Sequence, residues 1–281
     1  MLVNSSPAAR PTKKTLAMKL GVSRSSLYYQ RKRPTADQEL KVRIEMVLKV
    51  HPFYGHRRIA IELGSNKKRI RRVMKLFGLQ PISRRKRPKK EEDEGKPASE
   101  HLNLIKGLCP IRPDVVWVSD FTYIPYQGGF IYLATIMDLF SREIIGWHVS
   151  RYHDAQLVLD ALKHAVGHAI HRLPVYLHSD QGSEYESHSY ARIVAHLGIK
   201  FSASAKASPW QNGYQESFYS QFKLELGDPG RFEQFGQLIE AIHQQIRYYN
   251  YDRIHTALKK SPVQFYNSYQ SRLFRPLDKV S

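Results

Sequence analysis

Two stretches of the sequence decide the fold that we expect: HSDQGSEY at residues 178–185 and SPWQNGYQESFYSQFKLEL at residues 208–226. The first follows a short apolar run, so we expect Asp180 at the end of a buried strand. The second predicts a helix, because Ser208 is a good N-cap and Pro209 suits the first helical position. A carboxylate at a strand end is therefore followed closely by a helix with a polar face.

That helix has two different faces. Tyr214, Phe218 and Phe222 recur every four residues and predict one apolar face. Glu216 and Lys223 are seven positions apart, which is about two helical turns, so they share a separate polar face. The pattern predicts that a carboxylate and an ammonium group are presented together.

A third acid lies upstream, in VVWVSDFTYIPY at residues 115–126. Asp120 stands in the middle of an otherwise apolar and aromatic strand. A buried carboxylate is costly unless a positive charge compensates it. Divalent metal does this well, since two Mg²⁺ ions roughly 3.5–4 Å apart can activate an attacking oxygen and stabilise a leaving oxygen in phosphoryl transfer.

Other acids and histidines compete for such roles. Asp138 more readily caps a turn or pairs with Arg142, and Asp154 is placed to cap the helix that follows it. Lone histidines are more often structural groups than metal ligands. The remaining competitors are Glu184, Glu186, His178 and His255.

The composition limits the class of protein. At 281 residues the chain has room for about two domains. Its apolar runs are too short for a membrane span, and its polar, basic start is not typical of a secretory signal. The single cysteine, Cys109, excludes an internal disulfide framework and any multi-cysteine zinc site. These features favour a reducing, cytoplasmic setting.

Positive charge is concentrated in the first part of the chain. Residues 1–100 hold 26 Lys and Arg against 9 Asp and Glu, whereas the remaining residues hold 18 against 16. Such a division indicates a polyanion-binding module joined to a nearly neutral one, and nucleic acid is the polyanion that we expect.

The first residues predict helix-turn-helix patterning. Residues 13–33 indicate two short helices around a Gly-Val-Ser turn, with Leu16, Leu20 and Leu27 on their buried faces. The alternative is a small helical hairpin that does not touch DNA.

Three further helices are expected before residue 82. An amphipathic helix at 37–50 leads through HPFYGHRRIAIEL at 51–63 into a third helix that Asn66 caps. That third helix is strongly basic, as recognition helices often are. Its expected core positions are Ile70, Val73, Met74 and Phe77.

The domain plan follows from these patterns. We expect a helical DNA-binding region at 1–82, a charged linker at 83–101, a catalytic core at 102–270 and a tail at 271–281. Within the core, three antiparallel strands followed by alternating helices and strands predict a mixed sheet with helices on its faces, an α/β class.

The chain also resembles a known family. WVSDFTYI, IYLATIMDLFSREIIGW, HSDQGSEY and the helix of Glu216, followed by YNYDRIHTALKKSPVQF, resemble the integrase core of bacterial insertion-sequence transposases. The likeness is to the second-reading-frame (OrfB) product of the insertion sequence three family, which is related to retroviral integrases, and it spans roughly residues 14–267.

The resemblance implies a ribonuclease-H-like fold and DDE chemistry. Asp180 and Glu216 are separated by 35 residues, the spacing of that family's triad, and Lys223 matches its basic residue seven positions after the glutamate. Asp120, Asp180 and Glu216 would be the catalytic residues and the ligands of Mg²⁺ or Mn²⁺, with two ions expected. The chain departs from retroviral integrases, because one cysteine cannot build their His2Cys2 zinc module.

The same resemblance implies partners. They are DNA, as element ends and target, further copies of this chain on DNA, and an OrfA product supplied by frameshift fusion or association. No membrane is expected to take part. Lys223, Lys206 and Trp210 would line the channel at the active site, with Trp210 stacking on an unpaired base. The expected DNA contacts in the helical region are Arg57, Arg58, Lys67, Lys68, Arg69, Arg71 and Arg72.

Two other functions compete with this interpretation. One is a DNA-binding regulator that keeps the fold but does no chemistry alone, and the other is a general nuclease of the ribonuclease-H type. All three acids are present, which weighs against the first. The basic helical region and Lys223 weigh against the second.

Overall fold

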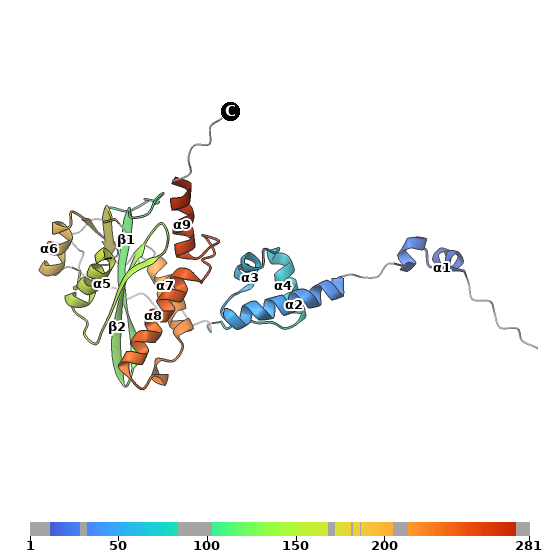
Figure 1. Cartoon of the computed structure of the whole chain (residues 1–281), viewed down its shortest axis with the longest axis horizontal. Coiled ribbons are helices and arrows are strands. Elements are labelled where there is room, and N and C mark those ends of the chain that lie inside the picture. Colours follow the sequence, from blue (N-terminus) through green and yellow to red (C-terminus); the bar gives the residue numbers. More distant parts are fainter. Residues whose placement is uncertain are drawn as a thin grey trace, which may run out of the picture.

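The computed structural model describes residues 12–28, 33–83, 103–167, 172–180, 182–185, 187–204 and 213–273. Figure 1 shows a sheet-bearing core and, beside it, a module of three helices, which we call the helical module. The helical module consists of α2 (Arg33–Val50), α3 (His56–Glu62) and α4 (Lys67–Leu76).

The core is built on one mixed sheet of five strands in the order β3-β2-β1-β4-β5. The first three strands pair antiparallel, as the sequence predicts, and β4 and β5 continue the sheet parallel to β1. Their bounds are β1 Val116–Tyr126, β2 Gly129–Asp138, β3 Ile144–Ser150, β4 Tyr176–Ser179 and β5 Lys200–Ala203.

Helices cover both faces of this sheet (Figure 1). Alternate residues of β2 serve the two sides: Ala134 and Ile136 pack against α5 and α6, whereas Leu133 and Met137 pack against α7 and α8. The helices of the core are α5 (Ala155–Gly167), α6 (His188–His196), α7 (Gly213–Leu226), α8 (Phe235–Tyr251) and α9 (Pro262–Leu273), with a short 3₁₀ turn η3 (Pro229–Arg231) before α8.

The described part of α7 begins at Gly213, so the predicted start at Ser208 lies outside the described residues. Its apolar face is confirmed for Phe218 and Phe222, which are buried. Tyr214 is half exposed instead, and the Arg142 guanidinium stacks on its ring at 3.5 Å.

The helical module has its own core, as the sequence predicts. Ile44 of α2, Ile59 of α3 and Ile70 and Val73 of α4 are completely buried together. The Asn66 side chain caps α4 by accepting the Lys68 N–H at 2.8 Å. The turn between α3 and α4 therefore has a defined geometry.

The first helices differ from the prediction. Residues 13–33 give α1 (Lys13–Lys19) and a short 3₁₀ helix η1 (Arg24–Tyr28). Leu16 and Leu20 are exposed rather than buried, and Ala17 is buried instead. The expected buried face was wrong because α1 is only about two turns long and packs through a small residue.

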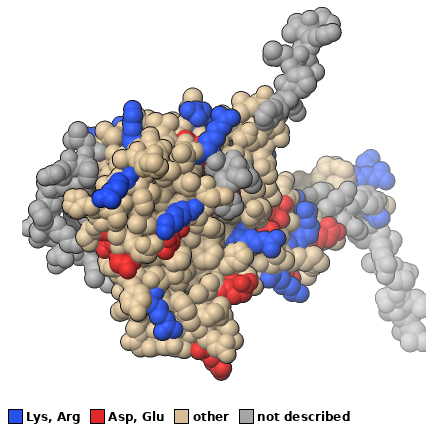
Figure 2. Space-filling model, turned by 60° about the vertical axis from the view of Figure 1, so that its left-hand side comes forward, with Lys and Arg blue, Asp and Glu red and all other residues tan. Residues whose placement is uncertain are grey.

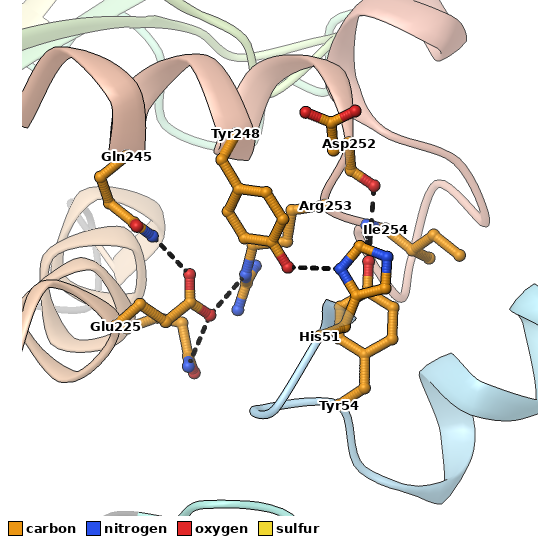
Figure 3. Close-up of polar contacts among 9 residues, drawn as sticks. His51, Tyr54, Glu225, Gln245, Tyr248, Asp252, Arg253 and Ile254 are labelled. Carbon is orange, nitrogen blue, oxygen red and sulfur yellow. Dashed lines mark hydrogen bonds and ion pairs between the residues drawn. The ribbon is translucent and has the colours of Figure 1, made fainter. Parts of the chain in front are cut away.

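Aromatic contacts join the helical module to the core (Figure 3). The His51 ring stacks on Tyr54, with centroids 4.3 Å apart, and its Nδ1 shares a 2.7 Å hydrogen bond with the Tyr248 hydroxyl of α8. The Tyr54 hydroxyl accepts the Ile254 N–H at 2.7 Å and donates to the Asp252 carbonyl. His51 and Tyr54 therefore connect the helical module to the core through hydrogen bonds as well as through ring packing.

Among the residues that the structure describes, no helix combines the length and the apolarity that a membrane crossing requires.

The packing of α5 on β3 depends on a glycine. A Cβ at Gly146 would lie 2.5 Å from the Ala161 carbonyl oxygen and 2.6 Å from the Ala165 Cβ. We therefore expect Gly146→Ala to lower the free energy of unfolding by about 1–3 kcal/mol, measured by urea unfolding. Gly236→Ala is the matched control, because nothing lies within 4 Å of that added methyl group. Equal stability of the two variants would contradict the close packing.

Candidate active site and nucleic-acid surface

The parallel pairing of β1 and β4 brings two of the predicted acids together. Val118 pairs with His178, so Asp120 and Asp180 each lie two residues further along neighbouring strands in the same direction. Adjacent strands are about 4.8 Å apart, so this register places the two aspartates side by side at the carboxyl end of β4. Both side chains are half-buried.

The segment after Asp180 is tied back to β1. Asp180 Oδ1 accepts the Gly182 N–H at 3.2 Å. Tyr185 is 1% exposed, and its hydroxyl lies 3.1 Å from the Ser119 Oγ, next to Asp120. The segment that follows Asp180 is therefore held against the strand residue next to Asp120.

Two side chains of α7 clamp this helix to the same strand. The fully buried Gln215 donates from Nε2 to the Val118 carbonyl at 2.8 Å. One turn later, the Tyr219 hydroxyl donates to the Asp120 carbonyl at 2.7 Å. Thr135 of β2 completes the clamp, with its Oγ1 3.2 Å from Gln215 Oε1 and 2.7 Å from the Tyr219 hydroxyl. Glu216 is exposed in the first turn of the clamped helix.

The three acids interact electrostatically. Burial raises the pKa of Asp120 well above its usual range, and the negative charges of Asp180 and Glu216 raise it further. A group of like charges in a low-dielectric setting favours a cation between them. Within the described residues, however, no three His, Cys, Asp or Glu side chains lie close enough together to enclose one ion.

The other acids that were candidates for the site make structural contacts in the described part of the chain. Asp138 is fully buried and caps the turn after β2 by accepting the N–H and hydroxyl of Ser141, both at 2.7 Å. Asp154 caps α5. Glu184 pairs with His153 Nε2 at 3.0 Å. Glu186 lies outside the described residues.

His178 is a structural residue in this arrangement. Ser202 Oγ accepts the Leu104 N–H at 2.9 Å and lies 3.0 Å from His178 Nδ1. Burial lowers the pKa of His178 to about 4, so the imidazole is neutral at pH 7. The contact ties the segment before β1 to β4 and β5.

A basic cleft lies at the turn between α3 and α4. It has a volume of about 590 Å³, and no acid is found among the described residues that line it. The predicted contacts Arg57, Lys67 and Lys68 meet there, together with Lys259 from the segment before α9. Figure 2 shows Lys and Arg side chains, with Asp and Glu among them, where the core meets the helical module.

Three other predicted DNA contacts are engaged within the protein. Arg72 makes two hydrogen bonds to the buried carboxylate of Asp37, at 2.8 and 2.5 Å. Arg69 donates to the Ala36 carbonyl at 3.4 Å. Arg58 packs against Tyr54 at the junction, and its Nε is buried.

Among the remaining predicted DNA contacts, Arg71 and Lys223 take part neither in the basic cleft nor in the internal contacts described above. Arg71 is exposed on α4. The Lys223 ammonium lies 4.5 Å from the centroid of the Tyr123 ring on β1. Lys206 and Trp210 lie outside the described residues.

Sequence reasoning missed the residues that position the acids. The clamp consists of Gln215, Thr135 and Tyr219, which hold α7 on β1. A second contact, between Ser119 and Tyr185, ties the segment after Asp180 to β1. A signal was present, because Thr135 and Ser119 are buried hydroxyl residues in largely apolar strands. The partner of each hydroxyl depends on tertiary contacts.

The comparisons with known proteins agree with this geometry. Residues 110–209 match the family model described as "Integrase core domain", and residues 197–262 match a second model with the same description. The chain is 37% identical to the "Transposase for insertion sequence element IS904" of Lactococcus lactis subsp. lactis, covering 73% of this chain and 82% of that protein. The chain belongs to the insertion-sequence transposase family.

Other matches extend the assignment. The transposase is 33% identical to the "Transposase InsF for insertion sequence IS3A" of Escherichia coli, covering 61% of this chain and 62% of that protein. It also matches the solved structure of a simian T-cell lymphotropic virus intasome with a TM-score of 0.52 at 14% identity, covering 85% of this chain and 78% of that one. The sheet and its covering helices therefore have the ribonuclease-H-like integrase fold, and the chain is a DDE polynucleotidyl transferase.

The clamp gives a testable prediction. Tyr219→Phe removes the hydroxyl that reaches Thr135 and the Asp120 carbonyl, so we expect a loss of about 1–3 kcal/mol in unfolding free energy. Tyr251→Phe on α8 is the control, since Tyr251 is 51% exposed. Urea unfolding of both variants measures the difference. An unchanged midpoint for Tyr219→Phe would show that the clamp is not stabilising.

Proposed function

We propose that Asp120, Asp180 and Glu216 are the catalytic carboxylates with which this transposase cleaves element ends and transfers the DNA strand. The observation that supports this most directly is the β1–β4 register, which makes Asp120 and Asp180 neighbours. The Gln215–Tyr219 clamp brings the helix of Glu216 to the same strand. The three acids thus come from three elements that one hydrogen-bonded unit holds together.

The chemistry of the three carboxylates suits a divalent metal, and binding would draw them together, since in the described residues no three His, Cys, Asp or Glu side chains lie close enough to enclose one ion. Carboxylate oxygens are the ligands that Mg²⁺ prefers. Burial, and after it the negative charges of Asp180 and Glu216, raise the pKa of Asp120, and a bound cation would favour its charged form. We assign Asp120, Asp180 and Glu216 as ligands of two Mg²⁺ or Mn²⁺ ions. Held by these carboxylates, the ions would supply charge stabilisation for the attacking oxygen and the leaving 3′-oxygen. Lys223, on the same helix as Glu216, binds a phosphate of the DNA end.

DNA contacts extend from the helical module. In this proposal the region 1–82 binds DNA, 83–101 links it to the catalytic core 102–270, and 271–281 is a tail. The basic cleft supplies Arg57, Lys67 and Lys68, with Arg71 beside them and Lys259 from the core. Lys206 and Trp210 act at the channel near the active site.

The transposase acts with partners in the bacterial cytoplasm, on the nucleoid when bound to DNA. Two element ends must be joined together, so several copies assemble on DNA. In this proposal an OrfA segment adds end recognition. A regulator without chemistry remains the rival function, and a strand-transfer assay separates the two.

The catalytic assignment is tested with charge-neutral variants. We expect Asp120→Asn, Asp180→Asn and Glu216→Gln each to reduce strand transfer of labelled element-end duplexes by at least about 10³-fold in Mg²⁺, because each removes a transition-state charge contact. DNA binding should be retained. The OrfA-fused form is assayed alongside the chain alone, and EDTA should abolish all product.

A matched acid distinguishes the site from general charge effects. Glu240→Gln neutralises a carboxylate that is 62% exposed on α8 and should transfer strands like the unaltered protein. Undiminished transfer by Asp180→Asn would overturn the assignment.

The DNA surface is tested by salt dependence. Replacing Lys67 and Lys68 together with Ala should weaken binding to duplexes of any sequence, and the slope of log K against log salt should fall by about 0.9 for each lost phosphate contact. Lys75→Ala, exposed in the last turn of α4, is the control. Fluorescence anisotropy over a salt series gives both slopes. An unchanged slope in the double variant would place DNA elsewhere.

A further inference from the structure

A small cavity lies at the junction of the helical module and the core. Its volume is about 80 Å³, and its lining includes Arg58 of α3, Arg142 of the β2–β3 turn, and Arg253 and His255 after α8. A single water needs only about 10–15 Å³, so the cavity has room for a larger polar group. Ser217 of α7 also lines it, directly after Glu216 in the chain.

Four residues that line the cavity each carry a buried nitrogen atom without a hydrogen-bond partner. Arg58 Nε, Arg142 Nη1, Arg253 Nη2 and His255 Nδ1 are all buried and make no hydrogen bond within the described structure. Buried polar groups are normally satisfied, and each orphan costs free energy. The four residues that carry these atoms come from three separate segments and line one cavity. Three of the atoms are guanidinium nitrogens, which can only donate, and this indicates a ligand that accepts hydrogen bonds.

The charge at the cavity is positive. The three arginines keep their charge at any ordinary pH. Glu225, the carboxylate that pairs with Arg253, is already engaged, because it accepts from Arg253 Nε at 2.7 Å, from Gln221 and from Gln245 (Figure 3). Burial and the three arginine charges lower the pKa of His255 to about 4, so this ring is neutral at pH 7. The described residues that line the cavity include three arginines and no acid, so the lining carries a positive charge.

We propose that this junction cavity binds a phosphate group. A tetrahedral oxyanion matches several guanidinium donors at once, and charge-assisted hydrogen bonds of this kind are strong. The group is either a phosphodiester of the DNA backbone or free phosphate. Because the donors come from α3, the β2–β3 turn and the segment after α8, a bound phosphate connects the helical module to the core beside the helix of Glu216. This binding goes beyond the proposed strand transfer, since it requires neither metal nor reaction.

The test is isothermal titration of inorganic phosphate into the full chain, in chloride buffer with EDTA. We expect one site per chain, and binding at least about tenfold weaker in Arg142→Gln. The control is Arg247→Gln, an exposed arginine of α8 whose loss should leave the affinity unchanged. Absence of binding to the unaltered protein, or equal affinity in Arg142→Gln, would overturn the proposal.

A second variant makes the test independent of folding defects. Ser217→Asp places a carboxylate at the cavity, so it should abolish phosphate binding and raise the Tm in phosphate-free buffer. A lower Tm together with retained phosphate binding would count against the site. Repeating the titration on the DNA-bound protein identifies the source: loss of the phosphate signal assigns the site to the DNA backbone, and an unchanged signal assigns it to free phosphate. Neither result depends on Asp120, Asp180 or Glu216, so a failure of the catalytic assignment is seen separately.

Discussion

The position of β1 between β2 and β4 is the constraint on which the rest of this structure depends. Because β1 is antiparallel to one neighbour and parallel to the other, its central residue Asp120 faces Thr135 on one side and Asp180 on the other. A slip of one residue would turn Asp120 to the opposite face of the sheet and separate it from both. The buried Trp117 and Leu177, paired across β1 and β4, hold this register.

Polar residues inside the core also help to fix the position of α7 on β1. Gln215, Thr135 and Tyr219 satisfy one another and two backbone carbonyls of β1, so burial leaves none of them without a partner. Such a network specifies one docking position for α7, whereas an apolar face alone would tolerate small rotations. The orientation of Glu216 is therefore determined by its neighbours on the helix.

The helical module is joined to the core by directional contacts as well as apolar ones. Ile254 belongs to the module's apolar core, and Tyr54 binds the backbone on both sides of Arg253. The buried Arg253–Glu225 pair lies at the same place, with side chains 3% and 4% exposed. A buried ion pair with additional hydrogen bonds favours one arrangement of its surroundings over others. Changes at this junction are thus connected physically to α7, which carries both Glu216 and Glu225.

The sequence by itself determined the order of strands and helices, the three candidate acids and the basic character of the first hundred residues. Apolar periodicity and caps such as Asn66 are local signals, and the spacing of Asp180 and Glu216 is visible in a single chain. Only the tertiary structure decided which basic side chains are engaged within the protein, since Arg58 and Arg72 carry the same local pattern as Lys67 and Lys68 yet contact Tyr54 and Asp37. It also decided the partners of Thr135, Gln215 and Tyr219. Those contacts join residues about 80 or more positions apart, and chain distance carries no information about which buried hydroxyl will meet which carbonyl.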